Sequence, residues 1–399
     1  MTAGIVCEYN PFHKGHLYHI RKTKEAGADF IVCVMSGNFV QRGECAFADK
    51  WTRAKAAVLC GADVVIDLPV PWACASAENF AKGSIGLLCD FGIDMLSFGS
   101  EWEDAELLKR CAEALDDANV GSLLKDKMSS GLSYPSALCE SVGELYGERE
   151  KSVLSSPNST LAVEYIRALN KISPEVRLLP VKRKGSGHDS GEVIGDTASA
   201  SKIRAFERLS DSENYIPEKA YCLLKEAFND GNGPYRIKTG ERAVLSVLRE
   251  MKKEECSVYV TDSSGLANRL YDAVKTADSP EALCEKAKSK NFTLSRVRRE
   301  LINLFLKIPK DMSKEKVPYM RILAVSEKGV GLLGRAKENS SVPVITRHSE
   351  AAMLSEKAKE VYEIQCAATD KFGLFTERIR ECSLEQKNSM KIISRPDGQ

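Results

Sequence analysis

The sequence predicts an α/β protein with a doubly wound parallel sheet, followed by a mostly helical C-terminal domain. Short, continuous apolar runs recur through the first hundred residues, and segments with helical periodicity separate them. After about residue 208 this alternation stops and helical patterns follow one another. The chain has 399 residues, which is enough for two domains. We therefore expect one domain over residues 1–208 and a second over residues 209–399.

The first domain is expected to begin with four strands joined by helices. The predicted strands are Ala3–Glu8, Phe30–Met35, Val64–Leu68 and Asp94–Phe98, and the predicted helices are His16–Ala26, Asp49–Cys60 and Ala75–Cys89. Continuous apolar strands that alternate with amphipathic helices are typical of a parallel sheet covered on both faces. Ligands of such sheets bind beyond the carboxyl ends of the strands, so the loops at that edge are where a site is expected.

The rest of the chain is mostly helical by its pattern. A helical region over residues 104–147 precedes a helix at Asn158–Lys171 and a strand at Val176–Lys182. The segment TASASKIRAF, which follows a loop rich in Gly and Ser, has the pattern of a helix start. Further predicted helices are Glu218–Phe228, Gly240–Glu250, Ser264–Thr276, Pro280–Lys290 and Leu294–Leu306. Residues 318–346 form a mixed patch with strand-like pieces.

Composition limits the classes of function. The net charge is +1, so any binding to nucleic acid requires a local basic patch rather than a global field. The 13 cysteines include no Cys-x-x-Cys pair, which favours free thiols in a reducing compartment over disulfides or a cysteine metal site. No apolar run approaches the roughly 18 residues of a membrane span, and no signal peptide is recognisable. We therefore expect a cytoplasmic protein without membrane contact.

Three of the five histidines, His13, His16 and His19, lie within seven residues after the first predicted strand. Zinc-binding helices usually carry His at i and i+4 with a carboxylate nearby, whereas the spacing here is three and three, with Gly15 between the first two. A phosphate-handling loop fits better, because a helix N-terminus offers free N–H groups and partial positive charge. His13 and His16 could then donate hydrogen bonds to oxygens that gain charge in a transition state. His19 is one turn further on and is expected to be structural.

Two motifs resemble those of the nucleotidylyltransferase superfamily. His13-x-Gly15-His16 resembles its H-x-G-H signature, and Ala198–Arg204 (ASASKIR) resembles its I-S-S-T-x-I-R motif, with Ala for the second Ser and Ser for Thr. The resemblance implies attack on the α-phosphate of ATP, with Ser201 and Arg204 holding the β- and γ-phosphates. An ordinary Ser cap with a solvated Arg is the alternative. Lys310–Lys314 (KDMSK) looks like a synthetase K-M-S-K-S loop, but its distance from the nucleotide domain indicates coincidence.

Longer strings resemble the bacterial tRNA(Met) cytidine acetate ligases. EYNPFHKGHLYHI, VMSGNFVQRGE, DVVIDLP, FGSE and SPN occur in the same order, and the similarity continues in FTLSRVRRELINLFL and PYMRILAVSEKG. The resemblance implies an enzyme that activates acetate with ATP as acetyl-adenylate. It further implies transfer of the acetyl group to N4 of the wobble cytidine of elongator tRNA(Met), giving N4-acetylcytidine. Mg²⁺ would be held mainly by the ATP phosphates, so no protein metal ligand is expected.

The same resemblance implies a set of ATP contacts, in which His13 and His16 are catalytic. The set is Val6, Cys7, Glu8, Tyr9, Asn10, Pro11, Phe12, His13, Lys14, Gly15, His16, Leu17, Tyr18, His19, Gly99, Asn158, Arg183, Ser201 and Arg204. From the residues alone, Gly99 could be a strand-end turn, Asn158 a helix N-cap and Arg183 part of a solvated basic loop. Asn38, Gln41 and Arg42, which follow the second strand, are candidates for contact with acetate or cytidine.

A basic patch is the candidate tRNA surface. Residues 291–321 contain eight basic against three acidic residues, and such a cluster neutralises backbone phosphates without reading sequence. The candidate tRNA contacts are Lys50, Arg53, Arg296, Arg298, Arg299 and Lys307. A solvated helix face, or salt-bridge partners in the case of Lys50 and Arg53, is the alternative.

Two other functions are compatible with the sequence. An adenylyltransferase acting on a small phosphorylated acceptor would use the same loop and would be indifferent to tRNA. A non-catalytic tRNA-binding protein on a nucleotide-binding fold would bind tRNA without consuming ATP, although the intact His13/His16 pair disfavours it. No obligate protein partner is evident from the sequence.

Overall fold

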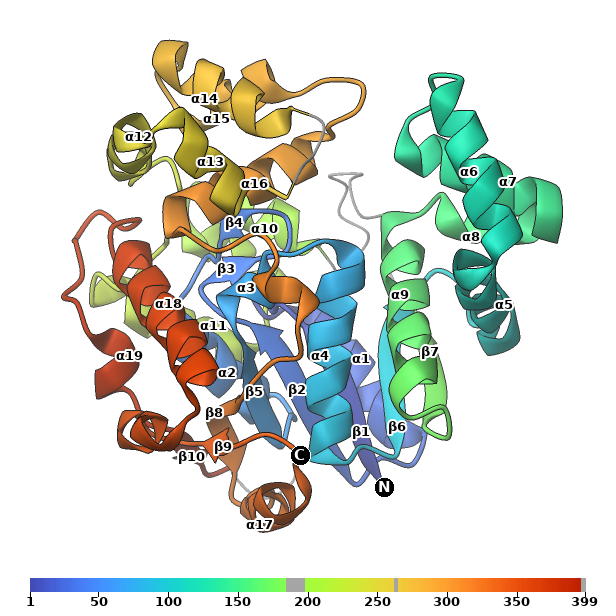
Figure 1. Ribbon diagram of the computed structural model, residues 1–399. Helices are drawn as coiled ribbons and strands as arrows, with labels where there is room; N and C mark the ends of the chain where they lie inside the picture. Colours follow the sequence, from blue (N-terminus) through green and yellow to red (C-terminus); the bar gives the residue numbers. More distant parts are fainter. Residues whose placement is uncertain (184–197, 262–264, 396–399) are drawn as a thin grey trace.

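The computed structural model describes residues 1–183, 198–261 and 265–395, except for the side chains of Pro157 and Asn158. Its centre is a mostly parallel sheet in the order β10-β8-β5-β2-β1-β6-β7, with β9 paired to β8 (Figure 1). The strands of this sheet are β1 Thr2–Cys7, β2 Phe30–Ser36, β5 Val64–Leu68, β6 Met95–Ser100, β7 Arg177–Lys182, β8 Met320–Ser326, β9 Val344–Ile345 and β10 Lys391–Ile393. The pairing of β8 with β5 is antiparallel, whereas β1, β2, β5, β6 and β7 are mutually parallel.

The first half of the chain supplies most of the flanking helices. They are α1 Lys14–Glu25, α2 Lys50–Leu59, α3 Val70–Ala73, α4 Ala77–Phe91, α5 Ala105–Asp116, α6 Ala118–Ser129, α7 Tyr134–Tyr146, α8 Glu148–Leu154, α9 Pro157–Ile172 and α10 Ala200–Ala205. A small antiparallel hairpin, β3 Phe39–Val40 and β4 Glu44–Cys45, follows β2. Helices α5–α8 form a lobe beside the sheet, at the right of Figure 1.

The second half is also largely helical. Its elements are η1 Leu209–Tyr215, α11 Glu218–Asn229, α12 Glu241–Glu250, α13 Lys253–Tyr259, α14 Leu266–Thr276, α15 Pro280–Ala287, α16 Leu294–Leu306, η2 Met312–Lys314, α17 Val330–Asn339, η3 His348–Met353, α18 Glu356–Phe372 and α19 Leu384–Lys387. Helices α12–α16 share a hydrophobic core that also includes Phe39 and Val40. This bundle therefore packs on the β3–β4 hairpin, at the carboxyl edge of the sheet (Figure 1).

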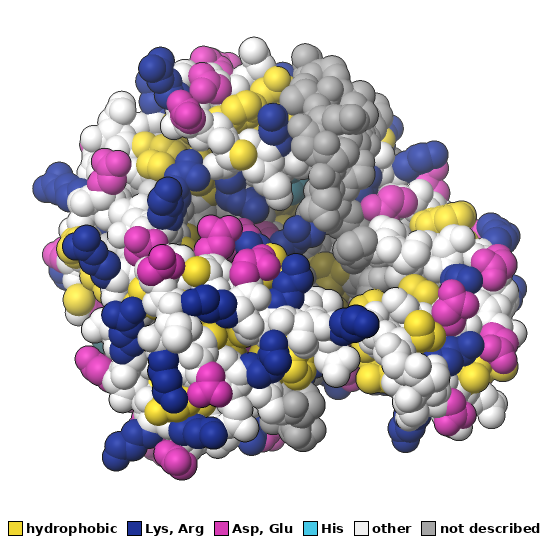
Figure 2. Space-filling model, turned by 90° about the horizontal axis from the view of Figure 1, so that it is seen from above, with side chains coloured by type: hydrophobic (Ala, Val, Ile, Leu, Met, Phe, Trp, Pro, Cys, Tyr) yellow, Lys and Arg dark blue, Asp and Glu magenta, His cyan; other side chains and the backbone are white. Residues whose placement is uncertain are grey.

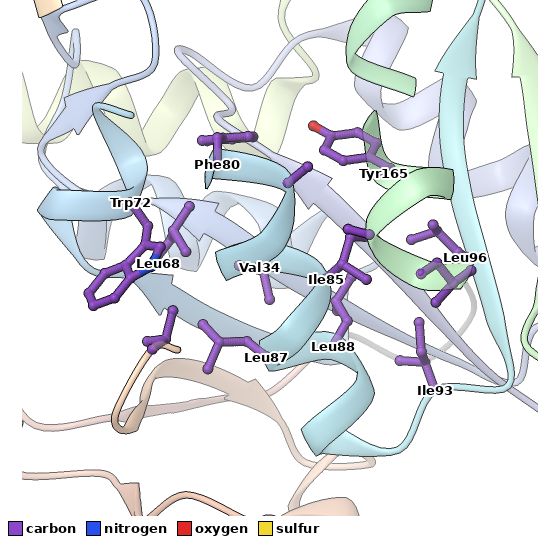
Figure 3. Packing of buried hydrophobic residues seen from close by; sticks show 14 of the residues in the cluster. Val34, Leu68, Trp72, Phe80, Ile85, Leu87, Leu88, Ile93, Leu96 and Tyr165 are labelled. Atoms are coloured by element: carbon purple, nitrogen blue, oxygen red, sulfur yellow. The ribbon is translucent and has the colours of Figure 1, made fainter. Parts of the chain in front are cut away.

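Alternate residues of the central strands point into two separate cores. In β2, Val32 and Val34 belong to one core, and Ile31 and Cys33 belong to the other. Successive side chains of a strand face opposite sides, so both faces of the sheet are buried, as the continuous apolar runs predict. Helices α4 and α9 cover the first face, where Figure 3 shows Val34 among the packed residues, and α1, α2 and α11 cover the second. The doubly wound architecture is confirmed.

The sheet does not end with the first half of the chain. Strands β8, β9 and β10 extend it beyond β5, although the sequence assigns residues 209–399 to a separate domain. Core residues such as Ile322 and Val325 belong to the same cluster as Val64 and Ile66. A boundary at residue 208 therefore divides one sheet. Helices α12–α16 share a core that is distinct from the two cores of the sheet but also takes in residues of the β3–β4 hairpin and of α18. Among the described residues, no helix is both long and apolar enough to span a bilayer.

Candidate active site

The loop between β1 and α1 is built around Tyr9 and Asn10. Tyr9 has a φ of 44°, and its buried ring makes edge contacts with Phe12 and His16. Asn10 accepts a hydrogen bond from the backbone N–H of Phe47 at 2.7 Å. These contacts fix the loop that precedes His13 at the carboxyl end of β1.

His13 and His16 cap the N-terminus of α1 through their Nδ1 atoms. Nδ1 of His13 accepts from the backbone N–H of Gly15 at 3.0 Å, and Nδ1 of His16 accepts from the backbone N–H of His13 at 3.2 Å. The two rings stack with their centroids 3.7 Å apart. A nitrogen that accepts a backbone N–H carries no proton, so each neutral imidazole has its proton on Nε2. The cap thus leaves two Nε2–H donors available to a ligand.

The electrostatic environment keeps both imidazoles neutral. Burial, followed by the charges of Arg183 and Arg204, lowers the pKa of His13 to about 3. Burial and the neighbouring His13 lower the pKa of His16 well below its ordinary value. Two stacked imidazolium ions would repel each other, which reinforces the same outcome. At neutral pH the pair donates hydrogen bonds without net charge.

These shifts predict that acid weakens the fold. Between about pH 3 and the ordinary His pKa of 6.5, the unfolded chain binds protons that folded His13 does not bind. The free energy of unfolding should therefore fall as the pH is lowered from 7 towards 5 in the absence of ATP. Thermal unfolding at several pH values would measure this slope. A His13→Asn, His16→Gln double variant should show a shallower slope, and an unchanged slope would contradict the assignment.

His19 has a structural role beside the cavity. Its Nε2 lies 2.9 Å from Oγ of Ser97 in β6, and Ser97 in turn lies 2.7 Å from Oγ1 of Thr23. This network joins α1 to the neighbouring strand. Burial lowers the pKa of His19 to about 4, so it too remains neutral at pH 7. The expectation that His19 is structural agrees with these contacts.

Gly15 lies too close to the His13 ring to carry a side chain without displacing it. A Cβ added there would lie 2.8 Å from Cε1 of His13, so a larger residue must displace the imidazole. If the two histidines stabilise an α-phosphate transition state, as the H-x-G-H resemblance implies, Gly15→Ala should lower ATP–pyrophosphate exchange by about 10- to 100-fold, because small misplacements of catalytic groups are that costly. The matched control is Gly86→Ala in α4, where the added Cβ meets nothing within 4 Å. An equal effect of the two substitutions would contradict the steric argument.

The second motif forms the start of α10. Ser199 caps the helix by accepting from the N–H of Lys202, so the capping residue is Ser199 and not Ser201. Arg204 donates to the backbone oxygen of Asn10 at 2.8 Å and lies 3.4 Å from Oγ of Ser201. The α10 helix start is therefore held against the loop after β1. Ser201 and Arg204 reach the same cavity as His13.

One cavity at the carboxyl edge of the sheet collects most of the predicted ATP contacts. Predicted residues that line it are Val6, Cys7, Glu8, Tyr9, Asn10, His13, Gly15, His16, Tyr18, His19, Gly99, Arg183, Ser201 and Arg204, together with Gln41 and Arg42. Pro11, Phe12, Lys14 and Leu17 are not among the lining residues. Asn158 lies in α9, but its side chain is outside the described residues. Sequence reasoning missed Phe80, Leu161, Tyr165 and Lys182, which also line the cavity.

The structure contradicts the predicted tRNA contacts at Lys50 and Arg53. Lys50 is 0% exposed and forms ion pairs with Asp67 and Glu385 at 2.5 and 2.7 Å. Arg53 is 1% exposed and donates to backbone oxygens of Glu8, Ser36, Gly37 and Ala48. Neither side chain can reach a tRNA phosphate. Arg53 instead ties the ends of β1 and β2 together beneath the cavity.

Asn38 is likewise wrong as a contact for acetate or cytidine. Its side chain is buried and bonds to the backbone N–H of Lys50 and to Thr369, and it does not line the cavity. Gln41 and Arg42, three and four residues later, do line it. The difference arises because the β3–β4 hairpin turns the chain between these positions.

The predicted basic patch lies next to this site. Arg298 of α16 pairs with Glu44 at 3.4 Å, and the other carboxylate oxygen of Glu44 pairs with Arg204 at the same distance. A Cβ on Gly43, whose φ is +72°, would lie 2.4 Å from the backbone of Arg298, so the hairpin is pressed against α16. Lys307, at the end of α16, is exposed. Figure 2 shows this face, hollowed between the α5–α8 lobe and the rest, with Lys and Arg side chains on both sides.

These features place the protein in the nucleotidyltransferase class of α/β proteins, in which an H-x-G-H helix start follows the first strand of a parallel sheet. The family model described as HIGH Nucleotidyl Transferase matches residues 1–387. A tRNA(Met) cytidine acetate ligase of Acetivibrio thermocellus is 37% identical over 389 residues, which covers 92% of this chain and 94% of the relative. One from Thermoanaerobacter sp. strain X514 is 38% identical over 382 residues, covering 93% and 94%.

Solved structures show the same relationship. Thermotoga maritima TmcAL superposes with a TM-score of 0.91 at 29% identity, covering 98% of this chain and 99% of that one, both as the apo protein and bound with alpha-thio ATP. The chain belongs to the tRNA(Met) cytidine acetate ligase family, and it is an enzyme.

Proposed function

We propose that this enzyme activates acetate with ATP as acetyl-adenylate and transfers the acetyl group to N4 of the wobble cytidine of elongator tRNA(Met). The observation that carries the proposal is the pair of neutral imidazoles, His13 and His16, whose Nε2–H donors remain free once both Nδ1 atoms cap α1. The family membership supports the acceptor.

The first half-reaction needs no nucleophilic side chain. A carboxylate oxygen of acetate attacks the α-phosphorus of ATP, the bond to the bridging oxygen breaks, and pyrophosphate leaves. His13 and His16 would donate to the α-phosphate oxygens, which carry more charge in the transition state than in ATP. Ser201, Arg204 and Arg183 line the same cavity, and Ser201 and Arg204 would hold the leaving pyrophosphate.

Mg²⁺ would enter with the nucleotide. Among the residues that the structure describes, no three His, Cys, Asp or Glu side chains cluster in a way that could hold a metal ion. ATP phosphate oxygens are themselves good ligands for Mg²⁺, which keeps several waters and takes few protein ligands at such sites. The ion would neutralise phosphate charge, and the roles of His13, His16, Ser201 and Arg204 do not depend on a protein ligand to it.

The tRNA would approach across α16. The helix packs on the hairpin that lines the cavity, so phosphates bound at its basic side chains would bring the tRNA near the reacting groups. Replacing both Arg296 and Lys307 by Ala should weaken tRNA binding and reduce the salt slope of the affinity by about one per lost phosphate contact. Binding measured over a salt series tests this. Lys275→Ala is the control, because Lys275 is an exposed cation on α14 and not on α16.

The deciding experiment measures ATP cleavage by the purified enzyme with acetate and Mg²⁺, with and without unmodified elongator tRNA(Met). The digested tRNA is then analysed by mass spectrometry. Release of AMP together with one acetyl group on the wobble cytidine would support the proposal. AMP or pyrophosphate release without tRNA modification would favour an adenylyltransferase with another acceptor. Absence of cleavage with retained tRNA binding would favour a non-catalytic tRNA-binding protein.

A further inference from the structure

Glu8 presents a carboxylate to the cavity at the carboxyl end of β1. Its Oε1 accepts a hydrogen bond from the backbone N–H of Gln41 at 2.9 Å, which fixes the side chain. Among the described residues, no hydrogen bond to Oε2 is present, and Glu8 lines the cavity. It is also the one carboxylate among the described residues of the cavity lining. One oxygen is thus anchored while the other remains available to a ligand.

The histidines cannot take up a proton in this cavity. His13 and His16 use Nδ1 to accept backbone N–H groups, and their other nitrogen already carries a proton. Nε2 of His19 is engaged by Ser97. Burial raises the pKa of the Cys7 thiol and of the Tyr9 phenol, so both are protonated at neutral pH. Glu8 is therefore the group of the lining best able to accept a proton from a substrate.

The wall beside Glu8 is aromatic and apolar. Phe80, Leu161 and Tyr165 line the cavity, and the rings of Phe80 and Tyr165 lie 6.5 Å apart. Figure 3 shows these two rings near each other, with the hydroxyl of Tyr165 directed towards Phe80. Burial raises the pKa of Tyr165, and the charge of Glu8 adds to that rise, so the phenol lies within electrostatic reach of the carboxylate. Both rings are largely buried in the core, so a flat aromatic base can meet this wall where it borders the cavity.

The chemistry of cytosine matches this arrangement. Its N4 amino group is a donor, and Glu or Asp side chains accept from it in nucleic-acid recognition. That amine is a weak nucleophile, because its lone pair is delocalised into the ring. It must also lose a proton when an amide forms. A fixed carboxylate next to an aromatic wall provides both the acceptor and the base.

We propose that Glu8 binds the N4 amino group of the target cytidine through Oε2 and takes its proton during acetyl transfer. This inference rests on the proposed function. N4 attacks the carbonyl carbon of acetyl-adenylate and the C–N bond forms. The bond from that carbon to the phosphate oxygen breaks, and AMP leaves with the electron pair. The N4 proton passes to Oε2 of Glu8 and then to solvent. His13 and His16 serve the first half-reaction, and Glu8 serves the second.

The charges around Glu8 set its basicity. Burial raises the pKa of the Glu8 carboxyl above its ordinary value of 4.5, and Glu44 acts in the same direction. The Gln41 N–H, Arg204 and Arg53 act in the opposite direction and limit the rise. A carboxylate of raised pKa is a better proton acceptor. The neighbouring Cys7, Cys74 and Tyr165 stay protonated, because burial raises the pKa of each.

The test separates the two half-reactions in Glu8→Gln and Glu8→Asp variants. Gln retains an oxygen for the Gln41 N–H but cannot take the proton. In single turnovers from acetyl-adenylate to tRNA, Glu8→Gln should slow transfer by about 10²–10⁴-fold, the usual range for a lost general base. Acetate-dependent ATP–pyrophosphate exchange should fall by much less. Glu8→Asp keeps a carboxylate, so it should recover part of the transfer rate. The pH profile of transfer should keep its acidic limb in Glu8→Asp and lose it in Glu8→Gln.

Glu44→Gln is the matched control, since Glu44 faces Arg204 and Arg298 and does not line the cavity. If Glu44→Gln also slows transfer while leaving exchange nearly unchanged, the role of Glu8 is overturned, because the loss of a nearby negative charge would then explain the effect in both variants. Equal losses of exchange and transfer in Glu8→Gln would overturn it too. If Glu8→Gln transfers the acetyl group at the wild-type rate, the inference about Glu8 is refuted and the proposed function stands. Absence of transfer by the wild-type enzyme would instead refute the proposed function.

Discussion

Replacing His13 by Asn and His16 by Gln should abolish adenylate formation and leave the start of α1 intact. Asn is a preferred N-cap residue, and Gln at the third helical position can complete a capping box. Both substitutions therefore keep the acceptors that Nδ1 supplies in the wild type, while both Nε2–H donors are lost. Loss of one transition-state donor costs about 10²–10³-fold in rate. The double variant should fall below detection in acetate-dependent ATP–pyrophosphate exchange.

Thermal unfolding of the same double variant distinguishes lost chemistry from lost structure, because its Tm at pH 7 should stay close to that of the wild type. His348→Asn is the control, since His348 contacts Tyr362 outside the cavity, and its exchange rate should be unchanged. Exchange at the wild-type rate in the double variant would refute the catalytic role of the histidine pair.

Lys50→Met should destabilise the protein severely. The substitution leaves Asp67 and Glu385 without their shared cation, and both carboxylates are almost completely buried. Removing one partner from a buried ion pair costs about 3–5 kcal/mol. Burial already raises the pKa of Asp67 to about 6 against the opposing effect of Lys50, so loss of Lys50 should raise that pKa further. Urea denaturation would measure the change in the free energy of unfolding.

The control for Lys50→Met is Lys22→Met, because Lys22 pairs with Glu25 on the surface of α1. Exposed pairs contribute about 0–1 kcal/mol, so this variant should remain close to the wild type. A loss of less than about 1 kcal/mol in Lys50→Met would show that the buried cluster is compensated in another way.

Local patterns predict the position of the histidine loop after β1 and the bounds of several central elements correctly. Val64–Leu68 is a strand with those bounds, and Leu294–Leu306 is a helix with those bounds. Both depend on periodicity and capping residues, which act over a few positions. The H-x-G-H loop is recognisable for the same reason, since its Gly and His residues are adjacent in the chain.

Long-range packing is not predictable from the same patterns. Lys50 looks like a surface cation on an amphipathic helix, but in the fold it is buried between Asp67 and Glu385, and Glu385 comes from far along the chain. The pairing of β8 with β5 is equally non-local and leaves no sign in the local sequence pattern. The change from alternating to helical patterns therefore suggests a domain boundary, although the sheet continues past it. The patterns also miss helix α18, although Tyr362 and Phe372 are buried in it. The role of Tyr165 in the cavity depends on how α9 packs against α4.

The late strands of the sheet have a consequence for protein synthesis. A ribosome releases β1 and the histidine loop well before β8 and β10. Until then β5 has an unpaired edge, and Lys50 lacks one of its two carboxylates. Contacts this distant in sequence form slowly, because a long loop must close before they stabilise anything. We therefore expect a nascent chain from which β8 and β10 have not yet emerged to be unable to cleave ATP.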